Sequence, residues 1–308
     1  MRVIITGGSG LIGRALTENL TADHHEVIVL SRNPDWVTGL PKGARAVKWD
    51  AKSAQGWGQL IDGAQVIVNL AGESLAGNIP FGTRWTAKRK KAINDSRLNA
   101  GKAVVEATQA AKTKPEVLVQ ASAVGYYGPS DDRRLTEEAP PADDFLANVV
   151  IQWENSTKPV EELGVRRVIT RTGLVFSGDD RILPWMAFPY RIFVGGPIAG
   201  GQQYYAWIHI ADEVAAIRFL IDHKEAHGVF NLTAPQQVPQ KEFGKAIGRA
   251  LGRPSWFPLP GFALKLAFGE AATLLIDGQN VAPAHLEQAG FEFKFPEVQP
   301  ALDDLLRN

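Results

Sequence analysis

Short apolar runs and longer stretches of helical spacing alternate along the first half of the chain. The apolar runs, rich in Val and Ile, predict buried strands at residues 3–6, 26–30, 45–49, 65–69, 117–121 and 167–172. Helical spacing predicts helices chiefly at residues 11–20, 86–111 and 144–163. Strands that alternate with helices are typical of a parallel sheet with helices on both faces. We therefore expect an α/β protein with a doubly wound, Rossmann-type sheet.

The pattern changes after Thr172. Residues 195–205 are rich in glycine and aromatic residues, and an amphipathic helix follows for which Asp212 is the predicted N-cap. The remaining chain alternates Pro and Gly with short apolar helices, such as residues 262–276 and 298–306. We expect residues 1–174 plus about 207–225 to form the sheet domain. A smaller α/β substrate domain is predicted from about 175–206 plus 226–308.

Composition excludes several classes of function. Lys plus Arg and Asp plus Glu number 33 each among 308 residues, which gives no support for nucleic acid or an anionic membrane as a partner. The chain has no cysteine, and its six histidines are scattered, so neither a thiolate nor a metal site is expected. No apolar run of about 18 residues and no signal-peptide pattern is present. We expect a cytoplasmic monomer or homodimer that acts on a small molecule.

A glycine-rich turn follows the first predicted strand. Residues 6–13 read Thr-Gly-Gly-Ser-Gly-Leu-Ile-Gly, directly before the first predicted helix. In this setting Gly7 and Gly8 permit a tight turn, Gly10 admits a pyrophosphate, and Gly13 lets helix and strand pack closely. The free N–H groups of the helix N-terminus add a partial positive charge. The predicted phosphate contacts are Gly7, Gly8, Ser9, Gly10, Leu11, Ile12 and Gly13.

The end of the second predicted strand indicates which dinucleotide binds. An NAD site usually has Asp or Glu there, to bond the ribose 2′-hydroxyl. This strand ends in Ser31 and Arg32 instead. A carboxylate would repel a 2′-phosphate, whereas a hydroxyl and a guanidinium bind it. We therefore predict NADP(H) as the cofactor, with a solvated loop position as the alternative for Arg32.

Several further segments together carry a family resemblance over essentially the whole chain. They are Asn69-Leu-Ala-Gly-Glu73, Arg84-Trp85, Ser96-Arg97, Ser122-Ala-Val-Gly-Tyr-Tyr-Gly128, Trp153-Glu154, Arg171-Thr-Gly-Leu-Val175, Gly195-Gly-Pro-Ile198, Trp207-Ile-His-Ile210, Pro258-Leu-Pro260, Phe268-Gly269, Gly278-Gln279 and Ala289-Gly-Phe-Glu-Phe293. With the glycine turn, they resemble the extended short-chain dehydrogenase/reductase superfamily. Within it, the chain is similar to the NAD-dependent epimerase/dehydratase group, also labelled nucleoside-diphosphate-sugar epimerase-like, including a C-terminal module of one subgroup.

The resemblance implies further cofactor contacts. Asp50 matches a position near the adenine ring, and Leu70, Ala71 and Gly72 match a segment that passes beside the adenosine and ribose. Arg97 resembles a position at the ribose–nicotinamide end, as does the backbone of Leu174 and Val175.

The acid/base pair usual in this superfamily is missing. Most members carry Tyr-x-x-x-Lys on the helix after the fifth strand, where the Lys lowers the pKa of the Tyr. The tyrosines here are Tyr126, Tyr127, Tyr190, Tyr204 and Tyr205, and four residues after each stand Ser130, Asp131, Val194, Ile208 and His209. If Glu154 matches the acidic residue that the superfamily carries on this helix, the Tyr position falls on Leu146 and the Lys position on Val150. Neither side chain can transfer a proton.

Another acid/base residue is therefore required if the protein is an enzyme. We select Tyr126 and Tyr127, on the loop after the fifth strand, together with Ser122, although counting back from Tyr127 puts Ala123 on the usual serine position. A packed tyrosine with a satisfied hydroxyl is the alternative. His209 and Glu73 are further candidates, against a buried structural histidine and a capping or surface carboxylate.

Two functions stay open on the sequence. The first is an NADP(H)-dependent oxidoreductase or epimerase that acts on a small carbonyl or nucleotide-sugar-like substrate. The second is a catalytically silent NADP(H)-binding regulatory or scaffold protein, since some relatives of the group carry cell-division-related labels. The basic run at residues 88–91 is interpreted as a solvated helix face rather than a phosphate site.

Overall fold

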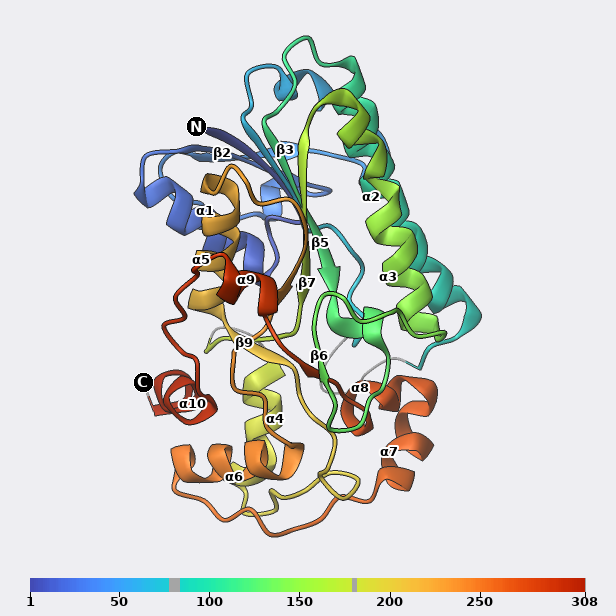
Figure 1. Ribbon diagram of the computed structural model, residues 1–308, viewed down its shortest axis with the longest axis vertical. Helices are drawn as coiled ribbons and strands as arrows, with labels where there is room; N and C mark the ends of the chain where they lie inside the picture. Colours follow the sequence, from blue (N-terminus) through green and yellow to red (C-terminus); the bar gives the residue numbers. More distant parts are fainter. Residues whose placement is uncertain (78–83, 179–181, 308) are drawn as a thin grey trace.

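A seven-stranded parallel sheet forms the centre of the molecule (Figure 1). The computed structural model describes residues 1–77, 84–178 and 182–307. The strands, in spatial order, are β10 (Gly228–Leu232), β7 (Arg166–Thr172), β5 (Val117–Ala123), β4 (Val66–Asn69), β1 (Arg2–Thr6), β2 (Glu26–Ser31) and β3 (Ala44–Lys48). The order reverses direction at β1, as in dinucleotide-binding sheets. The predicted Rossmann-type α/β fold is confirmed.

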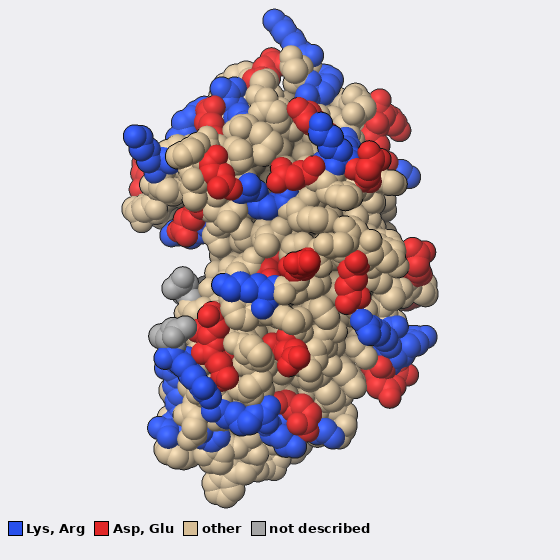
Figure 2. All heavy atoms as spheres, turned by 60° about the vertical axis from the view of Figure 1, so that its left-hand side comes forward, with Lys and Arg blue, Asp and Glu red and all other residues tan. Residues whose placement is uncertain are grey.

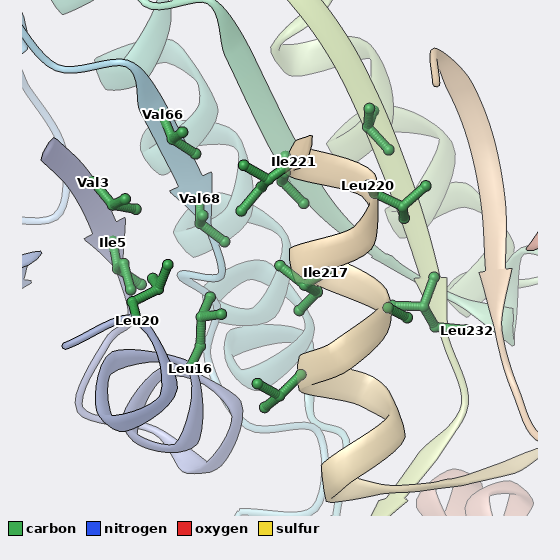
Figure 3. Close-up of a cluster of buried hydrophobic side chains, with 14 of the residues drawn as sticks. Val3, Ile5, Leu16, Leu20, Val66, Val68, Ile217, Leu220, Ile221 and Leu232 are labelled. Atoms are coloured by element: carbon green, nitrogen blue, oxygen red, sulfur yellow. The ribbon is translucent and has the colours of Figure 1, made fainter. Parts of the chain in front are cut away.

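Helices cover both faces of this sheet because its strands are apolar on both sides. On one face lie α1 (Leu11–Ala22) and α5 (Ile210–Asp222), and on the other α2 (Ala87–Ala110) and α3 (Phe145–Ser156). Figure 3 shows Leu16 and Leu20 of α1 and Ile217 of α5 pointing at Val3, Ile5 and Val68 of the strands. Packing of the helices on both faces thereby fixes the positions of the carboxyl ends of the strands.

The helix that follows residue 144 is shorter than predicted. The Asp144 carboxylate accepts the Ala147 N–H at 2.8 Å and so caps α3, which ends at Ser156. A 3₁₀ helix, Lys158–Leu163, replaces the predicted continuation. Pro159 explains the break, because proline supplies no N–H to an α-helix and clashes with the preceding turn.

The predicted cap of α5 was wrong. The helix begins at Ile210, and the Nδ1 of His209 accepts the Ala211 N–H at 3.0 Å. The Asp212 carboxylate instead accepts the backbone N–H groups of Lys294 and Phe295, each at 2.8 Å. Asp212 therefore holds the C-terminal segment against α5.

The C-terminal part of the chain packs at the carboxyl end of the sheet. Its elements are β8 (Leu174–Phe176) paired with β9 (Trp207–His209), β11 (Asn280–Val281) paired with β6 (Arg134–Leu135), α4 (Ile182–Arg191), α6 (Gln240–Leu251), α7 (Gly261–Phe268), α8 (Thr273–Ile276), α9 (Ala284–Gln288) and α10 (Val298–Arg307). Shorter 3₁₀ helices lie at Pro34–Trp36, Gly58–Ile61, Val124–Tyr127 and Gly269–Ala272. A separate apolar cluster around Phe176, Trp207 and Phe243 holds α4, α6 and α10 together.

Two boundaries differ from the sequence-based prediction. β10 joins the main sheet, so the sheet extends to Leu232, beyond the predicted domain limit near residue 226. The division into two domains stays a prediction. The helix predicted at 262–276 is interrupted at Gly269, whose φ of +61° lies outside the helical region.

Charged side chains of both signs are interspersed over the surface that Figure 2 presents, with Lys and Arg more frequent toward its lower end. This distribution agrees with the zero net charge. In residues 1–77, 84–178 and 182–307, no helix is long and apolar enough to cross a membrane.

Candidate functional site

The glycine turn between β1 and α1 is built so tightly that side chains would collide in it. A Cβ on Gly13 would lie 2.4 Å from the Cα of Gly8, and one on Gly7 would lie 2.9 Å from the carbonyl of Leu70. Gly7 also has a φ of +68°. Helix α1 begins just after Gly10 without a side-chain cap. The first N–H groups of α1 therefore have no side-chain acceptor, which suits binding of a phosphate group.

Buried polar side chains fix the strand ends beneath this turn. Thr6 Oγ1 donates to Asn69 Oδ1 at 2.6 Å, and Asn69 Nδ2 donates to Gln120 Oε1 at 2.8 Å. Thr6 Oγ1 also accepts the Ala71 N–H at 3.1 Å. This series of hydrogen bonds links β1, β4 and β5 and so fixes the backbone of residues 70–72. The family resemblance places these residues beside the ribose.

Ser31 and Arg32 lie at the carboxyl end of β2, near the glycine turn. The Arg32 side chain is exposed and, within the part of the chain that the structure describes, has no hydrogen bond or ion pair. Ser31 pairs in register with Lys48 at the end of β3, and the Lys48 ammonium donates to the Arg32 carbonyl. Lys48 is a second cation that the sequence analysis missed. The signal for it is its position as the last residue of the neighbouring strand.

Asp50 lies two residues beyond β3 and stabilises a local turn. Its carboxylate accepts the backbone N–H groups of Lys52 and Ser53, at 2.8 and 2.9 Å, and the Ser53 hydroxyl. The side chain is exposed on the same edge of the sheet as Ser31. Its predicted contact with adenine stays a prediction.

Arg97 of α2 packs against Gly72. A Cβ on Gly72 would lie 3.2 Å from the Arg97 Cζ, and the guanidinium stacks over Trp153 at 4.8 Å from the ring centre. Its Nη1 donates to the carbonyls of Glu73 and Ile93. Burial lowers the pKa of Arg97 to about 10, so the side chain stays protonated at neutral pH.

A cavity of about 370 Å³ opens next to Arg97. Its walls come from residues 123–125 at the end of β5, residues 172–174 at the end of β7, one side of α3, residues 204–206, and residues 270–279 around α8. Leu146 and Val150, the residues that the sequence comparison predicts at the usual Tyr and Lys positions, both line it. Strand carboxyl ends are where an open α/β sheet binds its ligands.

The structure places Ser122 and Tyr127 in a buried network rather than in the cavity wall. The Glu154 carboxylate accepts both the Ser122 hydroxyl, at 2.6 Å, and the Arg171 guanidinium, at 2.8 and 3.0 Å. Arg171 Nη1 donates to the Tyr127 hydroxyl at 3.1 Å, which donates in turn to Asn231 Oδ1 at 2.8 Å. Burial raises the pKa of Tyr127.

Tyr126 belongs to the same network through its ring. The Arg171 guanidinium carbon lies 3.3 Å from the ring centre of Tyr126, and the rings of Tyr126 and Tyr127 meet edge to face. Both hydroxyl-bearing rings thus have packing partners, and neither residue lines the cavity. A catalytic role for Ser122, Tyr126 or Tyr127 stays a prediction.

The other candidates lie outside the cavity wall as well. His209 caps α5, stacks on Phe295 and contacts Asp304, and burial lowers its pKa. The Glu73 carboxylate pairs with Arg89 at 2.9 Å. Val175 packs in the core, and only its neighbour Leu174 reaches the cavity.

Glu213 is a buried carboxyl that the sequence analysis missed. Its Oε1 accepts the hydroxyl of Thr172, a cavity residue, at 2.9 Å, while its Oε2 is buried without a partner in the described structure. Burial raises the pKa of Glu213 to about 8. The group is therefore mostly protonated at neutral pH. Its signal in the sequence is only a glutamate on the otherwise apolar face of a helix.

The raised pKa predicts a pH-dependent stability. An unfolded glutamate loses its proton near pH 4.5, the folded one near pH 8, so the folded state binds more protons between these values. Stability should fall as pH rises through this window and level off above it. Glu213→Gln should remove this decline, and be more stable than wild type by about 1–3 kcal/mol at pH near 8. Urea unfolding at several pH values measures the free energy of unfolding of both proteins. If this free energy depended on pH in the same way for both, the raised pKa of Glu213 would be contradicted.

The sheet order and the glycine turn define a Rossmann-type α/β protein. Residues 3–233 match the NAD dependent epimerase/dehydratase family, and residues 259–305 match a domain of unknown function, DUF1731. The chain belongs to the NAD dependent epimerase/dehydratase family. The resemblance seen in the sequence is thereby confirmed, including its C-terminal module.

Relatives match along nearly their full length. Epimerase family protein YfhF of Bacillus subtilis is 38% identical over 307 residues, which cover 99% of this chain and 98% of the relative. The chloroplastic epimerase family protein SDR39U1 homolog of Arabidopsis thaliana is 37% identical, with 100% and 87% covered. The crystal structure of human epimerase family protein SDR39U1 (isoform 2) with NADPH superimposes with a TM-score of 0.89, at 34% identity and with 100% of both chains covered.

Proposed function

We propose that this protein binds NADP(H) and acts as an oxidoreductase on a small carbonyl compound. The observation that carries the cofactor choice is the pair of cations, Arg32 and Lys48, at the strand ends beside the glycine turn. No carboxylate occupies the end of β2, where an NAD-specific site would have one. The human relative that contains NADPH in its crystal structure supports the same choice.

The residues present fit such a cofactor. At Gly7 and Gly13 a Cβ would collide with the backbone, so only glycine can form this turn. The uncapped start of α1 offers N–H groups to the pyrophosphate. Ser31, Arg32 and Lys48 would hold the 2′-phosphate. When bound, the cofactor supplies hydride chemistry. The side chains of Leu146 and Val150 would exclude water from the adjacent cavity.

A catalytically silent NADP(H)-binding protein is the second candidate. The specific observation in its favour is that Leu146 and Val150, predicted at the usual Tyr and Lys positions, line the cavity with apolar side chains. Neither side chain transfers a proton. The cofactor-binding half of the proposal does not depend on them.

Arg32→Ala tests the cofactor choice. Because the guanidinium would contact only the 2′-phosphate, the affinity for NADPH should fall by about 10- to 100-fold, while that for NADH stays unchanged. Arg45→Ala is a matched control, since Arg45 lies on β3 and pairs with Glu26 near the opposite end of the sheet. Calorimetric titration of the wild type and both variants with NADPH and NADH measures these affinities. Equal losses for NADPH and NADH in Arg32→Ala would mean that the residue does not read the 2′-phosphate.

Turnover separates the two candidate functions. Purified protein mixed with NADPH and a panel of aldehydes and ketones should consume the cofactor with at least one of them, as followed by nicotinamide absorbance. Tight NADPH binding without turnover on any compound would support the silent protein instead.

A further inference from the structure

Part of the wall of the cavity comes from the C-terminal module. Residues 270–279 contribute Thr273, Leu274, Asp277 and Gln279, and residues 204–206 lie beside them. The module is held there closely: the Gln279 N–H donates to the Tyr204 carbonyl at 3.0 Å, and a Cβ on Gly278 would lie 1.9 Å from that oxygen. The side chain of Asp277 is therefore part of a fixed wall, not of a loose loop.

Most titratable groups in the wall already have partners. Asp144 caps α3, Glu270 pairs with Lys90 at 2.6 Å, and the Tyr205 hydroxyl donates to the Leu275 carbonyl at 2.7 Å. Arg97 donates to two backbone carbonyls. The Asp277 carboxylate is different, because no described residue donates a hydrogen bond to it or forms an ion pair with it.

The surroundings of Asp277 disfavour an additional negative charge. Burial raises the pKa of Asp277, and the charge of Asp144 adds to the rise, while Lys265 opposes it. A cationic or hydrogen-bond-donating group next to Asp277 would stabilise the charged form of its carboxylate. A phosphate or carboxylate placed there would meet two carboxylates already present.

The basic residues nearest the cavity do not provide a site for phosphate. In the run at residues 88–91, Arg89 pairs with Glu73, Lys90 with Glu270 and Lys91 with Asp95. Among the described lining residues Arg97 is the one cation, against Asp144, Glu270 and Asp277. A nucleoside diphosphate is normally held by several unpaired cations or free backbone N–H groups.

We propose that the cavity binds a small, largely apolar, neutral or cationic molecule whose hydroxyl or ammonium group donates to Asp277, and that it does not accept a nucleotide sugar. This inference rests on the proposed function, because it narrows the class of the carbonyl substrate. The substrate would be a largely apolar aldehyde or ketone that also carries a hydroxyl or amino group as the donor to Asp277, or the matching alcohol. The volume of about 370 Å³ fits the lower end of small-molecule sites. Asp277 is the specificity-determining residue.

A matched set of probes with one carbon skeleton tests the proposal: phenethylamine, phenethyl alcohol and phenylacetate, with UDP-glucose as the fourth. Their binding to the full-length protein is measured by ligand-observed NMR without added cofactor. The amine and the alcohol should bind at least about tenfold more tightly than phenylacetate, and UDP-glucose should not displace them. Tighter binding of phenylacetate or UDP-glucose, or no binding of any aromatic probe, would overturn the proposal.

Variants locate the effect. Asp277→Asn should cost the amine about tenfold in affinity while the alcohol changes little, because the amide keeps an acceptor oxygen without the charge. Asp222→Asn is the control, because it alters an exposed carboxylate at the end of α5, on the face of the sheet that does not carry α3. It should change the affinity for neither the amine nor the alcohol. Leu146→Phe, which fills the cavity, should weaken both probes. Unchanged amine binding in Asp277→Asn, with wild-type melting behaviour, would contradict the role of Asp277.

NADPH binding is titrated separately on the same proteins. If NADPH binds and the probe preferences are absent, the inference about the cavity fails alone. If the probe preferences hold and NADPH does not bind, the proposed function fails and the cavity assignment stands.

Discussion

Arg171→Met is expected to destabilise the fold by about 3–5 kcal/mol, because it leaves the Glu154 carboxylate buried without its ion-pair partner. The side chains of Arg171 and Glu154 are 4% and 11% exposed, and two hydrogen bonds of 2.8 and 3.0 Å join them. The Tyr127 hydroxyl would lose its donor at the same time. Urea unfolding followed by circular dichroism measures the loss.

Arg134→Met serves as the matched control. Arg134 pairs with Glu287 at 3.9 Å, and both side chains are largely exposed, so the change should cost less than about 1 kcal/mol. If Arg171→Met lowered the free energy of unfolding no more than Arg134→Met does, the buried network would contribute no more to stability than an exposed ion pair.

Because the network joins β5, α3, β7 and β10, its loss should also loosen the cavity wall.

Gly13→Ala is expected to abolish NADPH binding at the concentrations where the wild type is saturated. The added Cβ would lie 2.4 Å from the Gly8 Cα and 2.8 Å from the Gly7 carbonyl oxygen. Both neighbours are backbone atoms of the turn, so helix α1 must move away from it and take its N–H groups along. Such overpacking also costs the fold about 1–3 kcal/mol.

The control for this variant is Gly178→Ala. A Cβ there would meet the Leu305 carbonyl oxygen at 3.6 Å, which is an ordinary contact. NADPH titration and thermal melting of both variants separate a local effect from general unfolding. Wild-type affinity in Gly13→Ala would contradict a phosphate site at the start of α1.

The sheet and the glycine turn were predictable because their signals are local. Buried parallel strands are continuous apolar runs, as Val3-Ile4-Ile5 and Val66-Ile67-Val68 are, and the glycines stand where the strand passes into the helix. β10 was missed, since Gly228-Val-Phe-Asn-Leu232 is short and holds a polar Asn231 that is buried only through contacts with distant segments.

The details of the site depend on contacts between segments far apart in the chain. Tyr127 lies on the loop after β5, but its hydroxyl is directed into the core by Arg171 and Asn231, which no spacing reveals. Asp212 has the residue type of a cap, and its partners stand 82 and 83 residues later. Asp277 reaches the cavity only because the C-terminal module folds back against distant segments, as the pairing of β11 with β6 and the hydrogen bond from the Gln279 N–H to the Tyr204 carbonyl show.

The central claim is that the turn at the start of α1 and the cations at the ends of β2 and β3 hold NADP(H). Parallel calorimetric titrations of the wild-type protein with NADPH and NADH test it most directly. NADPH should bind in a one-to-one complex and at least about tenfold more tightly than NADH, because only NADPH carries the phosphate that Arg32 and Lys48 would meet. Equal affinity for the two cofactors, or no binding of either, would contradict the account.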